Sequence, residues 1–385
     1  MIYQKQVHPP REKLHHIITD LLALIRKNVV LTVAIALAIV TSCIVPLDAE
    51  YASYFDWKTL TCLFCTLAVI CALKNIWFFT ILARKIVACT GNLRISVIAI
   101  VYITFLGSML ISNDMALLTF LPLGFFVLTS TGKEKYMAFV FIMQNIAANL
   151  GGMLTPFGNP QNLYLYSKFN IPTGEFMGIM LLPFLAAIAL ITGCCMFLPR
   201  TKLAITEEFP HKLPLRRTAI YLLLFAFSII IVFRVIPYWI GLIVIPLALL
   251  LLDKSALKKV DYGLLATFFC FFIFAGNMAR IPVVSELFSA LLQKNTLLFS
   301  ILSCQVISNV PSAILLSQFT VDYPALLIGV NIGGTGTLIA SLASLITFRE
   351  YTAHNPEKTS SYLFQFTLYS FGFVIALTLI SLLVI

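Results

Sequence analysis

The chain has 385 residues with a formal net charge of +10, and 60% of them are hydrophobic while only 11% are charged. Because a soluble protein carries roughly a quarter charged residues, this composition excludes an ordinary soluble protein. Many apolar runs reach the ~18–20 residues needed to cross a bilayer, and lipid requires each backbone group to find a partner within its segment. We therefore predict an all-α polytopic membrane protein.

The positive residues are concentrated in one alternating set of the loops between the apolar segments. Of the 26 Lys and Arg residues, 21 lie in the loops at 1–27, 74–94, 131–135, 199–217, 253–262 and 349–360. The other set of loops holds Lys58, Lys168, Arg234, Arg280 and Lys294. Since positive residues collect on the cytoplasmic side, we expect a cytoplasmic N-terminus, an external C-terminus, and a location in the plasma or inner membrane. The charge thus indicates orientation, and no nucleic-acid partner is expected.

The chain is expected to begin with a cytoplasmic amphipathic segment at 1–27, in which 11–26 forms a basic helix on the membrane surface. A first membrane repeat is predicted at 28–198, a cytoplasmic loop with a connecting span at 199–235, and a second membrane repeat at 236–385. The nine full spans are expected near 28–46, 57–73, 136–165, 175–198, 217–234, 236–252, 263–279, 323–348 and 361–385.

Two further apolar stretches, 95–132 and 295–321, do not fit as simple spans. The first is flanked by Arg94 and Lys133, so both of its ends belong on the cytoplasmic side. The second has 27 residues without a charge, whereas two crossings need roughly 40 residues, and loop alternation places its ends outside. We therefore predict two re-entrant helical hairpins, one entering from each side of the membrane.

The two hairpins have matching tips and are followed by matching Gly-rich spans. Ile-Ser-Asn occurs at 111–113 and, 196 positions later, at 307–309. The next spans contain ANLGGMLTPFGNPQN, from Ala148, and VNIGGTGTLIASLAS, from Val330, which align at an offset of 182. An odd number of crossings separates the halves, so the repeats are inverted, a known plan of secondary transporters. Gly and Pro should interrupt both spans, 136–165 and 323–348, near the midplane.

Interrupted helices offer groups that can hold ions. Half-helix N-termini offer N–H groups to an anion, and freed carbonyls with Asn and Ser oxygens can replace the hydration shell of Na⁺. In the first half, the predicted substrate- and ion-binding residues are Ser112, Asn113, Asp114, Asn149, Gly151, Gly152, Thr155, Asn159 and Asn162. In the second half, they are Ser308, Asn309, Asn331, Gly333, Gly334, Thr335 and Thr337. The candidate Na⁺ ligands among them are Ser112, Asn113, Ser308 and Asn309.

The same residues also have purely structural interpretations. Gly-Gly in a membrane helix often permits close helix packing, and Asn149 or Asn331 could simply bond neighbouring helices. The recurrence of the whole set, a tip followed by an interrupted span, favours a binding site over either of these.

Asp114 is the one acidic residue that we place inside the membrane. A charged group there is costly and usually functional. Burial disfavours the ionised carboxylate, whereas a nearby cation favours it, so Asp114 is a candidate for exchanging a proton or binding the coupling cation. Alternatively, it caps the second helix of the first hairpin, and the two roles are compatible.

No catalytic site or cofactor is predicted beyond a coupling Na⁺ or H⁺. The nine cysteines lie almost entirely in apolar segments, and Cys62-x-x-Cys65 has no second pair or nearby His to complete a zinc site. We therefore expect small hydrophobic side chains rather than metal ligands. An intramembrane protease would need a second carboxylate, a His pair, or an embedded His or Lys base. Such an enzyme is the distant alternative.

Four motifs of the chain resemble those of the ion transporter superfamily, which includes arsenite permeases, citrate transporter-like proteins and divalent anion:Na⁺ symporters. They are SND at 112–114, SNV-P at 308–311, GG-x-x-T-P-x-G-N-P-x-N at 151–162 and N-x-GG-x-G-T at 331–337. The resemblance covers nearly all of the chain. It implies inverted repeats, each with a re-entrant hairpin and an interrupted helix, and a homodimer.

The resemblance also bears on the substrate. In the dicarboxylate symporters of this superfamily, the resemblance implies the pattern Ser-Asn-Thr at both tips. This chain has Asp114 and Val310 at the third positions instead. An ionised Asp114 would repel a di- or trianion, and the Asn-Asp tip looks more like the arsenite permeases. Carboxylate binding through Thr155, Asn159 and Asn162 stays open.

The expected function is secondary active transport of a small anion, either a di- or tricarboxylate such as citrate or an oxyanion such as arsenite, coupled to Na⁺ or H⁺. An elevator-like or rocking movement would carry the hairpin tips between the two faces. The alternative is a Na⁺/H⁺ antiporter of the same fold. The expected partners are the anionic substrate, the lipid bilayer and, by resemblance, a second copy of the chain.

Overall fold

The structure, a computed structural model, describes residues 29–202 and 213–383. The predicted surface helix at 11–26 lies outside the described residues. Across the described ranges the chain forms helices joined by short loops, without a β-strand, and the predicted all-α membrane fold is confirmed.

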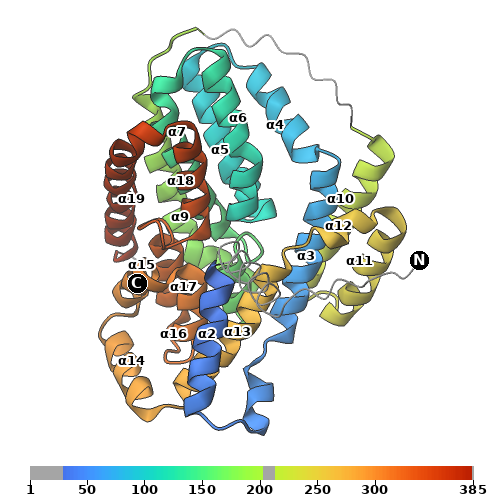
Figure 1. The fold of residues 1–385 in the computed structure, drawn as a ribbon, viewed down its shortest axis with the longest axis vertical. Coiled ribbons are helices and arrows are strands. Elements are labelled where there is room, and N and C mark those ends of the chain that lie inside the picture. The colour runs from blue at the N-terminus through green and yellow to red at the C-terminus, as the bar shows by residue number, and fades with distance from the viewer. Residues whose placement is uncertain (1–28, 203–212, 384–385) are drawn as a thin grey trace, which may run out of the picture.

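The first half of the chain contains eight described α-helices (Figure 1). They are α2 (Val29–Ile44), α3 (Trp57–Asn75), α4 (Phe78–Ala88), α5 (Leu93–Ile111), α6 (Asn113–Ser130), α7 (Met137–Gly151), α8 (Pro160–Lys168) and α9 (Thr173–Met196). Short 3-10 turns lie at η1 (Ala49–Tyr54), η2 (Glu134–Tyr136) and η3 (Gly152–Leu154).

The second half follows a similar order. Its helices are α10 (Leu215–Val232), α11 (Tyr238–Leu252), α12 (Lys254–Lys258), α13 (Tyr262–Ala279), α14 (Pro282–Lys294), α15 (Thr296–Ile307), α16 (Asn309–Leu316), α17 (Tyr323–Gly333), α18 (Leu342–His354) and α19 (Thr359–Ser381), with a 3-10 turn η4 (Pro356–Lys358).

Eight helical segments of the described chain are long and apolar enough to cross a membrane. Six coincide with predicted spans, and the other two are α5 and α6, with 19 and 18 residues. The predicted spans at 28–46, 236–252 and 323–348 contain shorter helices, α2, α11 and α17. The two hairpins therefore differ in size, because α15 and α16 have only 12 and 8 residues.

Two segments outside the predicted spans and hairpins contain helices of more than ten residues. In the loop at 74–94, α4 buries Phe79, Ile81 and Val87 and packs against α3, α5 and α6. Between the predicted span at 263–279 and the second hairpin, α14 forms a further helix. Both helices are amphipathic and carry charged residues, so their sequences resemble loops when only long apolar runs are sought.

Each hairpin packs against two interrupted helices. α5 lies along α7 and α15 along α17, while α6 contacts α18 and α16 contacts α8. In Figure 1, α5 and α6 occupy the upper part of the molecule, and α14 and α16 the lower part. The second arm of each hairpin thus contacts the other half of the chain.

Glycines allow this close packing. A Cβ atom on Gly151 would lie 2.1 Å from the backbone oxygen of Phe105 on α5. A Cβ atom on Gly333 would lie 2.8 Å from the Cβ of Cys304 on α15. For these two glycines the packing interpretation has direct support.

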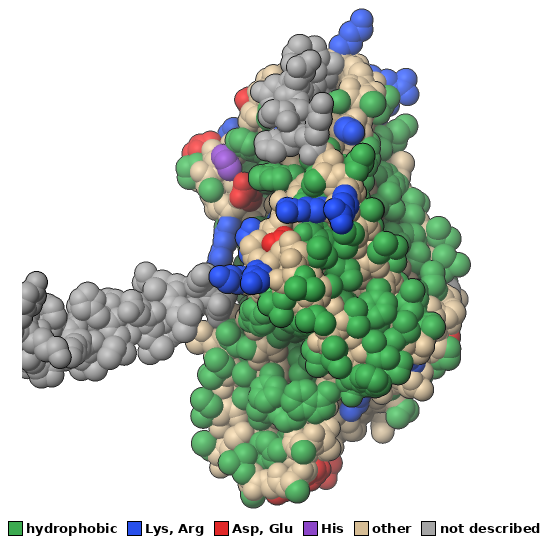
Figure 2. All heavy atoms as spheres, turned by 90° about the vertical axis from the view of Figure 1, so that its right-hand side faces the viewer, with side chains coloured by type: hydrophobic (Ala, Val, Ile, Leu, Met, Phe, Trp, Pro, Cys, Tyr) green, Lys and Arg blue, Asp and Glu red, His purple; other side chains and the backbone are tan. Residues whose placement is uncertain are grey.

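The outer surface is apolar where it would meet lipid. Figure 2 shows hydrophobic side chains over much of the face formed by α10 and α11, with Lys and Arg side chains gathered above them. The exposed large hydrophobic residues of these two helices are Leu215, Leu222, Leu223, Ile230, Tyr238, Trp239, Leu242, Ile243, Val244, Leu247, Leu250, Leu251 and Leu252.

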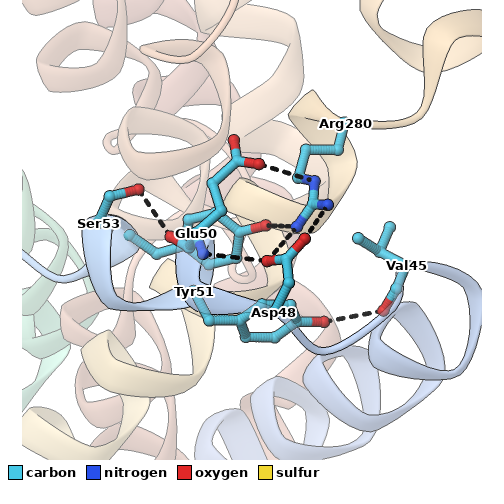
Figure 3. Close-up of polar contacts among 7 residues, drawn as sticks. Val45, Asp48, Glu50, Tyr51, Ser53 and Arg280 are labelled. Atoms are coloured by element: carbon cyan, nitrogen blue, oxygen red, sulfur yellow. Dashed lines mark hydrogen bonds and ion pairs between the residues drawn. The ribbon is translucent and has the colours of Figure 1, made fainter.

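Arg280 connects the segment after α2 to the end of α13 (Figure 3). It donates from Nη1 to Asp48 Oδ1 at 3.0 Å and to the hydroxyl of Tyr54 at 3.1 Å. Its Nε lies 3.3 Å from Glu50 Oε2, and a second bond joins Nη2 to Asp48 Oδ2 at 2.5 Å. We call these four residues the Arg280 cluster. It fixes the loop between α2 and α3 against α13.

The first prediction concerns Gly151→Ala. The added methyl group would meet backbone that cannot rotate away, so we expect the free energy of unfolding to fall by about 1–3 kcal/mol. Thermal unfolding in detergent measures this. Gly178→Ala is the matched control, because that exposed helical glycine has nothing within 4 Å of an added Cβ and should gain stability from alanine's helix propensity. Equal effects of the two substitutions would contradict the packing argument.

The second prediction concerns pH. The hydrogen bond from Arg280 holds the pKa of Asp48 below its ordinary value of 3.8. This stabilisation is therefore present above about pH 4 and is lost as the pH falls through the lowered pKa. We expect Arg280→Gln to lower the Tm at pH 7, and the difference from the wild-type protein to shrink below pH 4. The exposed Arg349→Gln is the control, and identical Tm values for Arg280→Gln and wild-type protein at pH 7 would refute the prediction.

Candidate functional site

The two hairpin tips have nearly the same backbone conformation. Ser112 has φ 70° and ψ 158°, and Ser308 has φ 73° and ψ 159°. At both tips the next side chain bonds the following backbone N–H: Asn113 Oδ1 accepts from Asp114 at 3.0 Å, and Asn309 Oδ1 accepts from Val310 at 2.9 Å. This region of φ and ψ is almost restricted to glycine, so each serine occupies a strained position.

The threonine of each interrupted helix contacts the first arm of its own hairpin. Thr155 donates its hydroxyl to the backbone oxygen of Met109 at 3.3 Å, and Thr337 donates to that of Gln305 at 3.1 Å. Met109 and Gln305 each precede the tip serine by three residues. The offset of 196 pairs Met109 with Gln305, and the offset of 182 pairs Thr155 with Thr337. Matched residues of the two halves therefore make corresponding contacts.

A chain of buried amides runs from the first tip to the other half of the molecule. Asn113 Nδ2 donates to Asn149 Oδ1 at 3.2 Å, and Asn149 Nδ2 donates to the backbone oxygen of Asn145 at 3.0 Å. Asn145 Nδ2 in turn donates to Ser344 Oγ on α18 at 3.2 Å. This chain joins α6, α7 and α18.

A second group of amides joins α8 to α17. Asn331 Nδ2 donates to Asn162 Oδ1 at 2.6 Å, and its own Oδ1 accepts from Asn159 at 3.4 Å and from Gln161 at 3.5 Å. Asn159 also donates to the backbone oxygen of Asn149 at 3.3 Å, which connects the two groups. We call the connected side chains the amide network; its amides are Asn113, Asn145, Asn149, Asn159, Gln161, Asn162 and Asn331, all buried.

The second tip lies against the interruption between α17 and α18. The backbone N–H of Asn309 donates to the oxygen of Ala340 at 2.9 Å, and Ser308 Oγ donates to the same oxygen at 3.2 Å. An added Cβ on Gly334 would lie 2.8 Å from Asn309 Nδ2. In the first half, an added Cβ on Gly152 would lie 2.5 Å from Asn159 Oδ1. These two glycines leave room for amide side chains.

Asp114 lies in the first turn of α6 and is only partly exposed. Its carboxyl group faces the backbone N–H of Ala343 in the first turn of α18. Its Oδ1 is buried and has no hydrogen-bond partner, and the start of α6 has no side-chain cap at Ser112. The capping alternative for Asp114 therefore has no hydrogen bond to support it.

Several buried oxygens near the tips also have no donor. They are Asp114 Oδ1, Asn159 Oδ1, Gln161 Oε1 and Thr335 Oγ1. A buried polar atom usually has a partner, and an exception needs an explanation. Oxygen atoms without donors are the ligands that a small hard cation takes. Among the described residues, no Lys or Arg donates to the amide network.

The space beside the first tip is small. A cavity of about 20 Å³ is lined by Ser112, by Phe157 and Pro160 of the first interruption, and by residues of α3. This volume holds roughly one water molecule or ion. This cavity therefore has no room for a tricarboxylate.

Sequence reasoning missed three amides of this region. Asn145 lies one helical turn before Asn149, and Gln161 lies between two residues that were predicted. Gln305 donates to the backbone oxygen of Gly333 at 2.9 Å and accepts from the N–H of Thr337 at 2.8 Å. The helical spacing of Asn145 and Asn149 was a usable signal, whereas nothing in the sequence distinguished Gln305.

Comparison with known proteins assigns the chain to a family. A family model described as citrate transporter matches residues 17–325. The chain is similar to "Uncharacterized transporter MJ0456" of Methanocaldococcus jannaschii, with 32% identity over 302 residues, 76% of this chain and 81% of that protein. It is also similar to "Inner membrane protein YbiR" of Escherichia coli, with 28% identity over 313 residues, 78% of this chain and 81% of that protein. With its eight candidate spans, the chain is a multi-pass membrane transporter and belongs to the CitMHS citrate transporter family.

Proposed function

We propose that this protein is a secondary active transporter that moves a small anion, a di- or tricarboxylate such as citrate or an oxyanion such as arsenite, coupled to Na⁺ or H⁺. The observation that supports this most strongly is the pair of tips, where Ser112 and Ser308 share a strained backbone conformation. Strain of this kind persists only where the surrounding structure enforces it, and it clusters at ligand sites. Membership of a citrate transporter family supports the same function.

Helix N-termini supply the attraction for an anion. α6, α8, α16 and α18 all begin beside the interruptions, and each first turn offers N–H groups with partial positive charge. The unpartnered oxygens of Asp114, Asn159 and Gln161 suit a cation. Anion and cation sites would thus be adjacent, which is the geometry that coupled transport needs.

Alternating access requires a movement of the tips. We propose that the two halves are inverted repeats, with the α5–α6 hairpin entering from the cytoplasmic side and the α15–α16 hairpin from outside. The opposite placement of the hairpins in Figure 1 supports this, as does the distribution of Lys and Arg in the loops. Because the cavity beside Ser112 is about 20 Å³, an elevator-like or rocking movement must open it before a carboxylate can bind.

A Na⁺/H⁺ antiporter is the second candidate. It is favoured by the unpartnered Oδ1 of Asp114, which lies next to Asn113 of the amide network, a network to which no Lys or Arg of the described chain donates. Proteoliposome experiments distinguish the two candidates. Citrate, arsenite or sulfate should drive cation flux through an anion symporter and should have no effect on an antiporter.

The third prediction concerns Asp114→Asn. If the carboxyl group exchanges the proton or binds the cation, uptake by this variant should lose its dependence on pH and on Na⁺, because asparagine neither ionises nor carries charge. Uptake into proteoliposomes under imposed gradients measures this. Glu134→Gln, an exposed acidic residue beyond the end of α6, is the control. An Asp114→Asn variant with wild-type pH and Na⁺ dependence would exclude the coupling role.

The fourth prediction uses the strain at the tips. Glycine adopts the conformation of Ser112 and Ser308 without steric cost, so Ser→Gly at either tip should leave the free energy of unfolding unchanged or raise it by about 1–2 kcal/mol. If the hydroxyls bind ion or substrate, the KM for uptake should nevertheless rise about tenfold or more.

Thermal-shift titrations with citrate, succinate, arsenite, sulfate, Na⁺ and Li⁺ measure binding at the tips independently of transport. A bound ligand raises the Tm because it stabilises the folded state. A stable Ser→Gly protein with wild-type KM values and wild-type thermal shifts would show that the hydroxyls serve only the fold.

A further inference from the structure

A second cavity lies apart from the amide network, at the turn between α10 and α11. Its volume is about 350 Å³, and it is lined by Lys58, Ile231, Arg234, Val235, Ile236, Pro237 and Tyr238. Small-molecule sites typically occupy about 300–1,000 Å³. The cavity is therefore large enough for a small organic anion, unlike the space beside Ser112.

Two positive side chains line this cavity, and neither is neutralised. Arg234 donates from Nη1 to Asn170 Oδ1 at 2.6 Å and from Nη2 to the backbone oxygen of Tyr166, and its guanidinium lies 4.0 Å from the centre of the Tyr166 ring. These partners are uncharged, and its buried Nε has no partner. All ion pairs found among the described residues belong to Arg280.

The side chain of Lys58 makes no hydrogen bond or ion pair within the described chain. The acidic group that acts on it is Asp56, but this carboxylate already caps α3, accepting from the N–H of Thr59 at 3.0 Å and from its hydroxyl at 2.6 Å. Arg234 and Lys58 are close enough for their charges to act on each other. Two like charges facing one hollow raise the local concentration of anions there.

Three connections lead from this cavity to the inner cavity beside Ser112. α3 continues from Lys58 to Leu63, which lines the inner cavity. α8 continues from Tyr166, beneath Arg234, back to Pro160, which also lines the inner cavity. Phe233, next to Arg234, meets Phe157 edge to face with ring centres 5.8 Å apart.

We propose that Lys58 and Arg234 form a second anion-binding site, which takes a carboxylate or oxyanion group of a soluble ligand before it reaches the amide network. The step toward the network rests on the function proposed above, whereas anion binding in the cavity does not. Phosphate groups of lipids share this chemistry, so the experiment separates the two sources.

The experiment measures acetylation of single lysines by an amine-reactive reagent, read by peptide mass spectrometry, on the full chain in phosphatidylcholine nanodiscs. Citrate and inorganic phosphate are compared with chloride at equal ionic strength. We expect both to slow acetylation of Lys58 several-fold, and Arg234→Gln to remove this protection. The control is Lys294, an exposed lysine of the same set of loops that does not line the cavity. Equal protection of the two lysines, or none at Lys58, overturns the site.

A second set of nanodiscs contains phosphatidylglycerol. Protection of Lys58 in these nanodiscs without added citrate or phosphate would identify the occupant as a lipid headgroup and would overturn the assignment to a soluble anion. Acetylation of Lys58 that stays fast in these nanodiscs until citrate or phosphate is added supports the assignment to a soluble anion.

Transport distinguishes this proposal from the proposed function. Lys58→Gln removes no hydrogen bond of the described chain, so we expect an unchanged Tm, a several-fold higher KM for citrate uptake and an unchanged kcat, with Lys294→Gln at wild-type values. Protection of Lys58 with no uptake of citrate, arsenite or sulfate by the wild-type protein would refute the proposed function and leave the site standing. Uptake by the wild-type protein without protection of Lys58 would refute the second anion-binding site and leave the proposed function standing.

Discussion

The structure depends on the need to pair backbone groups where helices stop inside an apolar environment. An unpaired N–H or carbonyl in lipid costs several kcal/mol. Around the two interruptions, side-chain amides provide the missing partners. Asn162 donates to the oxygen of Gly152 at 3.1 Å, and Gln305 bonds both the oxygen of Gly333 and the N–H of Thr337. The same amides bond the helices on either side of the interruptions to one another, so the requirement of the fold also creates a buried polar centre.

The need to pair both N–H and carbonyl groups explains why amide and hydroxyl side chains, rather than charged ones, surround the two helix interruptions. Asn and Gln both donate and accept, so one side chain can pair a carbonyl on one helix and an amide on another. A Lys or Arg in the same place would only donate and would have to be neutralised. Arg280 and Arg234 lie instead just beyond the ends of helices, where they bond loops to helices. The single exception near the tips is Asp114, whose Oδ1 has no partner.

Much of the architecture could be predicted because apolar runs and loop charges have simple physical causes. The two arms of the first hairpin fall at 93–130, close to the predicted 95–132, and the interruptions fall where Gly and Pro prevent helix. α4 and α14 were missed because short amphipathic helices lack a long apolar run. Contacts such as Asn145 with Ser344, or Gln161 with Asn331, depend on how the two halves pack. No local pattern encodes that packing, and the cavity volumes depend on it too.

The serines at the tips hold a strained turn in each half of the chain. Glycine would suit the backbone of Ser112 and Ser308 better than serine does. The neighbouring positions, Asp114 and Val310, differ between the tips, and so do the lengths of the hairpin arms. Serine nevertheless stands at both tips in a glycine-favoured conformation. Each turn therefore keeps a backbone strain that glycine would relieve, and each carries a hydroxyl group that glycine lacks.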